Sequence, residues 1–157
     1  YRYASFNSRS DKLFTEGSAS YLPFRESRCI IPATAFIEGL GDKKTYYKIE
    51  LEHSAIAFGG LFKEYLNRST GDKVYSASII TCAPRVAAWK DIHPQSMPLM
   101  IDITNQELTK KWLDVTFDDV KEFKPFFERE RATRMKVTQI DRPSKWNPIA
   151  KSFVVEA

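Results

Sequence analysis

The 157 residues are 43% hydrophobic, 28% charged and 13% aromatic, which is the composition of a folded globular domain. This excludes a globally disordered chain, and the length allows one domain with a proper core. The 24 basic and 20 acidic residues leave a formal charge of +4, which favours a polyanionic partner only weakly.

The two cysteines, Cys29 and Cys82, lie in apolar stretches with no CxxC motif and no neighbouring histidine. This pattern predicts reduced core thiols rather than zinc ligands or a disulfide. No apolar stretch approaches the ~20 residues that span a bilayer, and no signal-peptide pattern opens the chain. The sequence therefore predicts a soluble protein that is not secreted and needs no metal or cofactor.

Strands are expected in the centre of the chain, over residues 28–37, 46–51, 54–66 and 73–83. The first of these, RCIIPATAFI, consists of two short apolar runs broken at Pro32. In the third, Gly59 and Gly60 indicate a bulge or a close backbone approach. The alternation of apolar and polar residues in the other runs is typical of half-buried strands.

Helices are expected over residues 86–89 as a short turn, over 105–113, and over 117–131 with a break at Pro125. The sequence TNQE forms a capping box, with Thr104 as N-cap and Glu107 at the third helical position. Residues 135–140 are expected to form the last strand. Without repeats or a second composition regime, the prediction is one α+β domain with a mainly antiparallel sheet.

Three polar positions lie at the ends of apolar segments, where functional sites tend to form. Asn7 and Arg9 would emerge from the same face of an extended segment and could hold a phosphate, or they could belong to a surface turn. Glu38 is either a partly desolvated acid or base, or a solvated strand-end carboxylate. His93 either exchanges protons near neutral pH or caps the turn before Pro94.

Four blocks of this sequence resemble motifs of one family and occur in the same order. NSRSD, from Asn7, is similar to Asn-Ala-Arg-x-Glu, and RCIIPATAFIEG, which contains Glu38, is similar to Arg-Cys-Leu-Ile-Pro-Ala-x-Gly-Phe-Tyr-Glu-Trp. AFGGLFKEY resembles Ala-Phe-Ala-Gly-Leu-Trp-Glu, and IHPQSMPLMI, which contains His93, resembles Ile-His-x-Arg-Met-Pro-Val-Ile-Leu. The family is the SOS response-associated peptidase (SRAP) domain family.

The resemblance implies an α+β, mainly antiparallel, β-barrel-like fold with short flanking helices and a basic groove for single-stranded DNA. It implies that an N-terminal cysteine captures the ring-opened aldehyde of an abasic site and closes a thiazolidine ring. The expected partner is thus single-stranded DNA with abasic sites, bound by a monomer without metal or membrane. The implied location is the bacterial cytoplasm, beside the nucleoid, or the nucleus of a eukaryote.

The resemblance also assigns roles to individual residues. Asn7 would orient the sugar of the lesion, and Glu38 would move protons while the Schiff base forms and while the crosslink reverses. His93 would promote opening of the sugar ring and steady the leaving hydroxyl. Arg9 would bind a flanking phosphate through a charge-assisted contact.

This sequence departs from the family pattern in three places. The family's Met-Cys-Gly-Arg start and a Trp-Gly-Leu segment are absent, so residues 1–157 are expected to be an SRAP domain lacking its N-terminal segment. The nucleophile is expected outside this chain, because Cys29 matches the cysteine of the core motif. Gln95 and Ser96 precede Met-Pro where an arginine is usual, which removes one phosphate contact. Gly39 replaces the usual tryptophan after the glutamate.

Two other functions remain open from the sequence. The family name suggests a peptidase, with activity limited to its own leading residues, although no serine or cysteine with a base and no ligand cluster is visible. The missing nucleophile and the lost arginine also fit a DNA-binding module without lesion chemistry. A heat-stable adduct with abasic single-stranded DNA would separate this module from the crosslinking protein.

Overall fold

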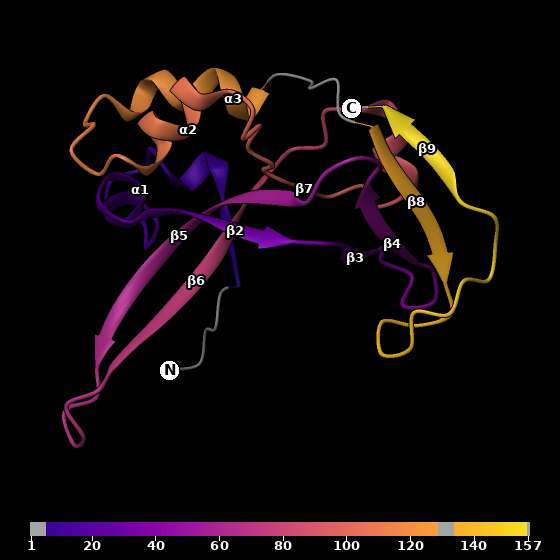
Figure 1. The fold of residues 1–157 in the computed structure, drawn as a ribbon, viewed down its shortest axis with the longest axis horizontal. Coiled ribbons are helices and arrows are strands. Elements are labelled where there is room, and N and C mark those ends of the chain that lie inside the picture. The colour runs from indigo at the N-terminus through magenta and orange to yellow at the C-terminus, as the bar shows by residue number, and fades with distance from the viewer. Residues whose placement is uncertain (1–5, 129–133, 157) are drawn as a thin grey trace. The chain divides into compact units, whose positions relative to one another are not determined.

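The computed structural model describes residues 6–128 and 134–156 (Figure 1). The chain divides into two compact units. Unit 1 comprises Tyr1–Ile31, Ala57–Cys82 and Pro98–Phe127, and unit 2 comprises Pro32–Ile56, Ala83–Met97 and Glu128–Ala157. Each unit is organised around a sheet of its own. The prediction of one domain over residues 1–157 stays a prediction.

Unit 1 is built on a five-stranded sheet with the order β1-β6-β5-β2, in which β7 also pairs with β6. Its strands are β1 (Asn7–Arg9), β2 (Arg28–Ala33), β5 (Ile56–Leu66), β6 (Lys73–Cys82) and β7 (Met97–Pro98). β5 and β6 form the long antiparallel hairpin seen in Figure 1, whereas β1 runs parallel to β6. Both strands of the hairpin were expected from the sequence, β6 from its alternation and β5 as the apolar run over residues 54–66.

Short helices and an aromatic cluster complete unit 1. The helical elements are η1 (Ser10–Lys12), α1 (Tyr21–Glu26), α2 (Gln106–Leu113), η3 (Val120–Phe123) and α3 (Lys124–Glu128). Trp112 on α2 is buried and meets the ring of Phe123 edge-on, with ring centroids 5.2 Å apart. Phe24 on α1 packs against both rings. Rings of this size dominate the apolar area that a small unit can bury, so this cluster forms the core.

The buried guanidinium of Arg28 joins the ends of two helices of unit 1. It donates hydrogen bonds to the carbonyl oxygens of Phe24 at 2.8 Å and Arg25 at 3.0 Å, near the C-terminus of α1. It also donates to the carbonyls of Trp112 at 2.8 Å and Asp114, at the end of α2. The last carbonyls of a helix have no partner within the helix, so this one side chain satisfies both ends.

Gly60 lies where β5 packs closely against its neighbours, as the paired glycines predicted. A Cβ atom at this position would lie 2.7 Å from Ile31 Cδ1 and 3.1 Å from the backbone oxygen of Ser78. We expect Gly60→Ala to lower the free energy of unfolding by about 1–3 kcal/mol, because a backbone oxygen cannot swing away. Urea unfolding against the exposed control Ser76→Ala measures the difference. Equal midpoints for the two variants would contradict the close approach.

Unit 2 contains a four-stranded antiparallel sheet with the order β3-β4-β8-β9. Its strands are β3 (Phe36–Gly39), β4 (Tyr46–Leu51), β8 (Arg134–Ile140) and β9 (Phe153–Glu156), and it includes the short helix η2 (Ala87–Asp91). Ile49, Met135 and Val137 are fully buried in the sheet. The α+β class and the mainly antiparallel pairing are therefore confirmed, with two open sheets in the part of the chain that the structure describes.

Several expected boundaries were wrong by a few residues. Pro32 lies inside β2, and the break between the two strands falls after Ala33. The N-cap of α2 is Asn105 rather than Thr104, because the Asn105 side chain accepts the bond from Leu108 N at 3.0 Å. Thr104 instead bonds to the carboxylate of Asp102. The Thr104 side chain is engaged by Asp102, so the neighbouring Asn105 caps the helix instead.

Two expectations for the C-terminal part also need correction. The segment from residue 117 is η3 followed by α3, and the helix α3 begins at Lys124, so Pro125 lies in its first turn and not at a break. Residues 129–131 of the expected helix lie outside the described residues. β8 is not the last strand, because β9 pairs with it from Phe153 to Glu156.

Candidate functional site

Glu38 and His93 lie together within unit 2, although 55 positions separate them in the sequence. Glu38 is on β3, opposite Tyr47 of β4, and its Oε2 atom lies 3.7 Å from His93 Nδ1. The side chain of Glu38 is 23% exposed and that of His93 is 22% exposed, so both are mostly buried but accessible to solvent. The structure thus brings a carboxyl group and an imidazole within ion-pair distance of each other at a partly desolvated position.

A second contact defines the tautomer of His93. Its Nδ1 atom lies 2.6 Å from the carbonyl oxygen of Gly39. A carbonyl oxygen can only accept a hydrogen bond, so Nδ1 carries the hydrogen and donates it. In the neutral imidazole the lone pair then resides on Nε2, which leaves that nitrogen able to take up a proton.

The segment before His93 is held against β3 by a buried tryptophan. Trp89 of η2 is fully buried and stacks on Phe36, with ring centroids 6.1 Å apart. Its indole N–H donates to the carbonyl of Ser96 at 2.8 Å, and the His93 amide donates to the Trp89 carbonyl at 2.8 Å. Phe36 and Glu38 point to the same face of β3, so the packing of Trp89 on Phe36 positions His93 next to the Glu38 carboxyl group.

Burial changes the acidity of the Glu38 carboxyl. Desolvation raises its pKa above the ordinary value, and the charge of His93 opposes this effect without cancelling it. A raised carboxyl pKa brings the group closer to neutral pH, where it can both donate and accept a proton. The pair therefore has the chemical properties of a general acid and base.

The turn between β3 and β4 is held by Asp42. Its carboxylate accepts hydrogen bonds from Lys44 N at 2.9 Å, Thr45 N at 2.7 Å and Thr45 Oγ1 at 2.7 Å. These donors lower the pKa of Asp42 to about 2. The same hairpin carries Glu38, so the turn helps to position the site.

We expect Asp42→Ala to destabilise this hairpin at neutral pH. Because the folded pKa of Asp42 is depressed, its stabilising contribution is present above the ordinary value of 3.8 and is lost as pH falls through about 2. Urea unfolding at several pH values should therefore show the variant converging with the wild type toward strong acid. A difference that grows as the pH falls would contradict the proposed bonding of the turn.

Asn7 and Arg9 lie in unit 1, on β1. Both are exposed, while Ser8 between them faces inward and its hydroxyl lies 2.8 Å from that of Ser78. The two side chains therefore emerge from the same face, as the extended conformation predicted. Arg9 forms two 2.9 Å bonds with the carboxylate of Asp11. Convergence of Asn7 with the Glu38–His93 pair stays a prediction.

An exposed ion pair such as Arg9–Asp11 contributes little stability. The guanidinium is 73% exposed and its two bonded nitrogens form the fork that also fits a phosphate. An incoming phosphate could therefore replace the carboxylate of Asp11 at small cost. This geometry is compatible with the predicted role of Arg9 and does not test it.

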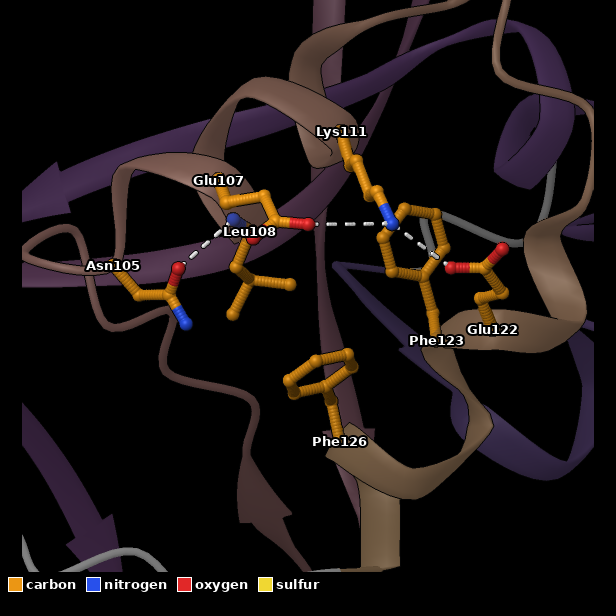
Figure 2. A pocket seen from close by; sticks show the side chains of 7 residues that line it. All are labelled: Asn105, Glu107, Leu108, Lys111, Glu122, Phe123 and Phe126. Atoms are coloured by element: carbon orange, nitrogen blue, oxygen red, sulfur yellow. Dashed lines mark hydrogen bonds and ion pairs between the residues drawn. The ribbon is translucent and has the colours of Figure 1, made fainter.

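A separate pocket of about 170 Å³ lies on the helices of unit 1 (Figure 2). The residues that line it are Asn105, Glu107, Leu108, Lys111, Glu122, Phe123 and Phe126. Lys111 lies between two carboxylates, 3.1 Å from Glu122 and 3.7 Å from Glu107, which raise its pKa. None of the predicted site residues lines this pocket, and the positive charge of Lys111 is neutralised by the two glutamates.

Metal-ligand clusters and membrane-spanning helices are absent from residues 6–128 and 134–156. No group of three or more metal-ligating side chains occurs among them. No helix among them has the length and apolar character that crossing a bilayer requires. Cys82 is buried and Cys29 is partly buried, and neither forms a disulfide. Burial raises the pKa of the Cys29 thiol, which disfavours the reactive thiolate.

Two contributors to the site were missed from the sequence. The carbonyl of Gly39 fixes the His93 tautomer, and Trp89 positions the segment that carries His93. A backbone carbonyl leaves no signature in a sequence. The tryptophan four residues before His93 was visible, but it was assigned only to a short turn.

Residues 1–143 match the SOS response associated peptidase (SRAP) family. The chain belongs to the SRAP family. Among its curated SRAP relatives, abasic site processing protein YoqW of Bacillus subtilis (strain 168) is 34% identical over 116 residues, which cover 71% of this chain and 49% of YoqW. Abasic site processing protein YoaM of the same organism is 35% identical over 116 residues, covering 71% of this chain and 48% of YoaM. This SRAP chain spans about half the length of the curated relatives it matches.

Solved structures share the fold of this SRAP chain. A crystal structure of a protein from Bacteroides thetaiotaomicron superposes with a TM-score of 0.67 and 25% identity, covering 88% of this chain and 59% of that one. A protein from Bordetella bronchiseptica gives a TM-score of 0.66 and 17% identity, covering 87% of this chain and 65% of that one. The second likeness supports the fold alone.

Proposed function

We propose that this SRAP chain contributes the acid–base site of a protein that captures abasic sites in single-stranded DNA. The names of the curated relatives, abasic site processing proteins, support the lesion as substrate. The observation that carries the proposal is the Glu38–His93 pair, with 3.7 Å between carboxyl oxygen and imidazole nitrogen. In a bacterium this function would place the protein at the nucleoid, and in a eukaryote in the nucleus.

The proposed chemistry needs protons moved at neutral pH. The α-amine of an N-terminal cysteine adds to the lesion aldehyde, and the resulting carbinolamine loses its hydroxyl as water to give the Schiff base. The thiol of the same cysteine then adds to the imine carbon and closes the thiazolidine ring, while the nitrogen takes up a proton. This cysteine is neither Cys29 nor Cys82, because the amine and the thiol must belong to the first residue.

In this scheme Glu38 donates the proton that lets the carbinolamine hydroxyl leave as water. Its raised pKa keeps a larger fraction of the carboxyl protonated near neutral pH than an exposed glutamate would have. Nε2 of His93 accepts a proton from the sugar hydroxyl during ring opening, since Nδ1 is engaged by the Gly39 carbonyl. Asn7 orients the sugar, and Arg9 binds a flanking phosphate.

The test is adduct formation by the full protein that contains these residues. It is mixed with single-stranded DNA carrying one abasic site and run on a denaturing gel after heating. A heat-stable adduct that needs both the lesion and the N-terminal cysteine supports the proposal. Reversible, salt-sensitive binding without an adduct would instead identify a DNA-binding module, and turnover of unrelated peptides that needs Glu38 would identify a peptidase.

A further inference from the structure

The loop between β8 and β9 of unit 2 is fixed by hydrogen bonds across its base. The Asp141 amide donates to the Asn147 carbonyl at 3.0 Å. The backbone and side-chain nitrogens of Asn147 donate in return to the Asp141 carboxylate, at 3.1 Å and 2.9 Å. Beyond the loop base, Ile140 and Pro148 form a β-bridge. The intervening residues are therefore presented on a closed and well-supported loop.

Trp146 lies in this loop, directly before Asn147, and has an unusual backbone conformation. Its φ of 63° is in the left-handed region, which is rare for a bulky residue. The backbone is held there by a 3.1 Å bond from its amide to the Arg142 carbonyl, and the indole N–H donates to the Pro143 carbonyl. The residue is nevertheless 49% exposed. The loop thus fixes the edge of the indole and leaves much of the ring in solvent.

Only positive charges accompany this ring between Asp141 and Glu156. Arg142, Lys145 and Lys151 are exposed, and no carboxylate occurs in the sequence RPSKWNPIAKSFVV that contains them. Lys145 and Lys151 form no ion pair with the residues that the structure describes. An aromatic ring that is held in place, in a segment that also carries unpaired lysines, matches the chemistry of single-stranded nucleic acid, in which planar bases alternate with phosphates.

We propose that the loop formed by residues 141–151 binds single-stranded DNA, with Trp146 stacked on a base and the flanking cations beside phosphates. This inference deepens the proposed function by adding a second DNA contact, and it does not require an abasic site. Most of the loop follows residue 143, where the match to the SRAP family ends. Stacking tolerates any base, so the contact would hold the strand without reading its sequence.

The native protein offers a direct probe, since Trp89 and Trp112 are buried and Trp146 is the exposed tryptophan of this chain. Undamaged oligo-dT of about 12 nucleotides, enough for a typical single-stranded site, is titrated while tryptophan fluorescence is recorded. The Trp146 signal is the difference between wild type and Trp146→Phe. We expect saturable quenching of this signal. Trp146→Ala should weaken oligo-dT binding about tenfold, and Trp146→Phe should weaken it less.

A charge variant tests the loop while keeping the ring. Lys145→Gln/Lys151→Gln should retain quenching at saturation but weaken binding and flatten its salt dependence. Lys121→Gln, an exposed lysine on η3 of unit 1, serves as the control and should leave binding unchanged. Binding that is the same in Trp146→Ala and wild type would overturn the proposal. So would quenching by anionic lipid vesicles without quenching by oligo-dT.

These results remain distinguishable from a failure of the proposed function. If no heat-stable adduct forms but Trp146-dependent binding of oligo-dT persists, the lesion chemistry is wrong and the loop contact stands. In a second case, the adduct forms normally, oligo-dT does not quench Trp146 fluorescence, and replacing Trp146 leaves oligo-dT binding unchanged. The loop contact is then wrong and the lesion chemistry stands.

Discussion

Glu38→Gln is expected to slow formation of the abasic-site adduct by about a hundredfold, the usual contribution of a general acid or base. Glutamine keeps the size of the side chain but cannot donate or accept a proton. Single-turnover assays on abasic single-stranded DNA measure the rate, and Glu50→Gln provides a matched control. Glu50 is 30% exposed and pairs with Lys48 at 2.8 Å on the neighbouring strand β4. Similar rates for the two variants would remove Glu38 from the chemistry.

The stability of the same variant provides a readout that does not depend on DNA. The folded pKa of Glu38 is raised above its ordinary value of 4.5 by burial. Its protonated form therefore stabilises the fold at pH below 4.5, and this contribution is lost as pH rises through the folded pKa. We expect Glu38→Gln to be more stable than wild type at neutral pH, with the gain disappearing in acid. A gain that is largest in acid would mean that the carboxylate is stabilised in the fold.

Opposite effects on activity and stability would be characteristic of a functional residue. A carboxyl kept partly desolvated costs stability, and that cost is retained where the shifted pKa serves a reaction. If Glu38 were merely a strand-end residue, its removal would change neither the adduct rate nor the pH dependence. The paired measurements therefore separate the catalytic role from the solvated strand-end carboxylate that the sequence left open.

The sequence predicted the long strands of both units and left several short elements undetected. The alternation in β4 and β6 and the apolar run of β5 extend over enough residues to indicate strands, whereas β9 has only four residues and three of them are exposed. Helix α1 was missed because its N-cap Ser20 makes no side-chain hydrogen bond and Pro23 interrupts the apolar pattern. Short elements are held by their neighbours, and the sequence alone does not display those neighbours.

The candidate site, like the fold, could be predicted from the sequence only in part. The positions of Glu38 and His93 at the ends of apolar segments suggested chemistry, and the family resemblance joined them. Their approach depends on Trp89 packing against Phe36, a contact across more than fifty residues that leaves no local pattern. The raised pKa of Glu38 likewise follows from burial in the folded unit. For Asn7 the face of β1 was predictable, and the role remains a prediction.

The largest loss of stability is expected from Arg28→Met, at about 3–5 kcal/mol, because it breaks a buried hydrogen-bond network. Arg28 is 2% exposed, and its guanidinium donates to carbonyls at the ends of both α1 and α2. Methionine fills similar space but leaves these acceptors buried without donors, and each unsatisfied group carries its full desolvation cost. A small domain is stable by only about 5–15 kcal/mol, so the variant should unfold at a much lower urea concentration.

Arg28→Lys separates the fork geometry from the charge. A guanidinium spreads its donors over three nitrogens, whereas an ammonium has three donors on one nitrogen and cannot bond to both helix ends at once. Lysine should therefore recover only part of the lost stability. Arg25→Met, which removes an arginine of α1 that bonds to the Tyr21 carbonyl at 2.9 Å, is the control and should cost less. If Arg28→Lys and wild type unfold at the same midpoint, the charge alone supports the two helix ends. If Arg28→Lys instead stays folded but loses only DNA binding, this arginine of the RCIIPATAFIEG motif contacts the ligand and not the core.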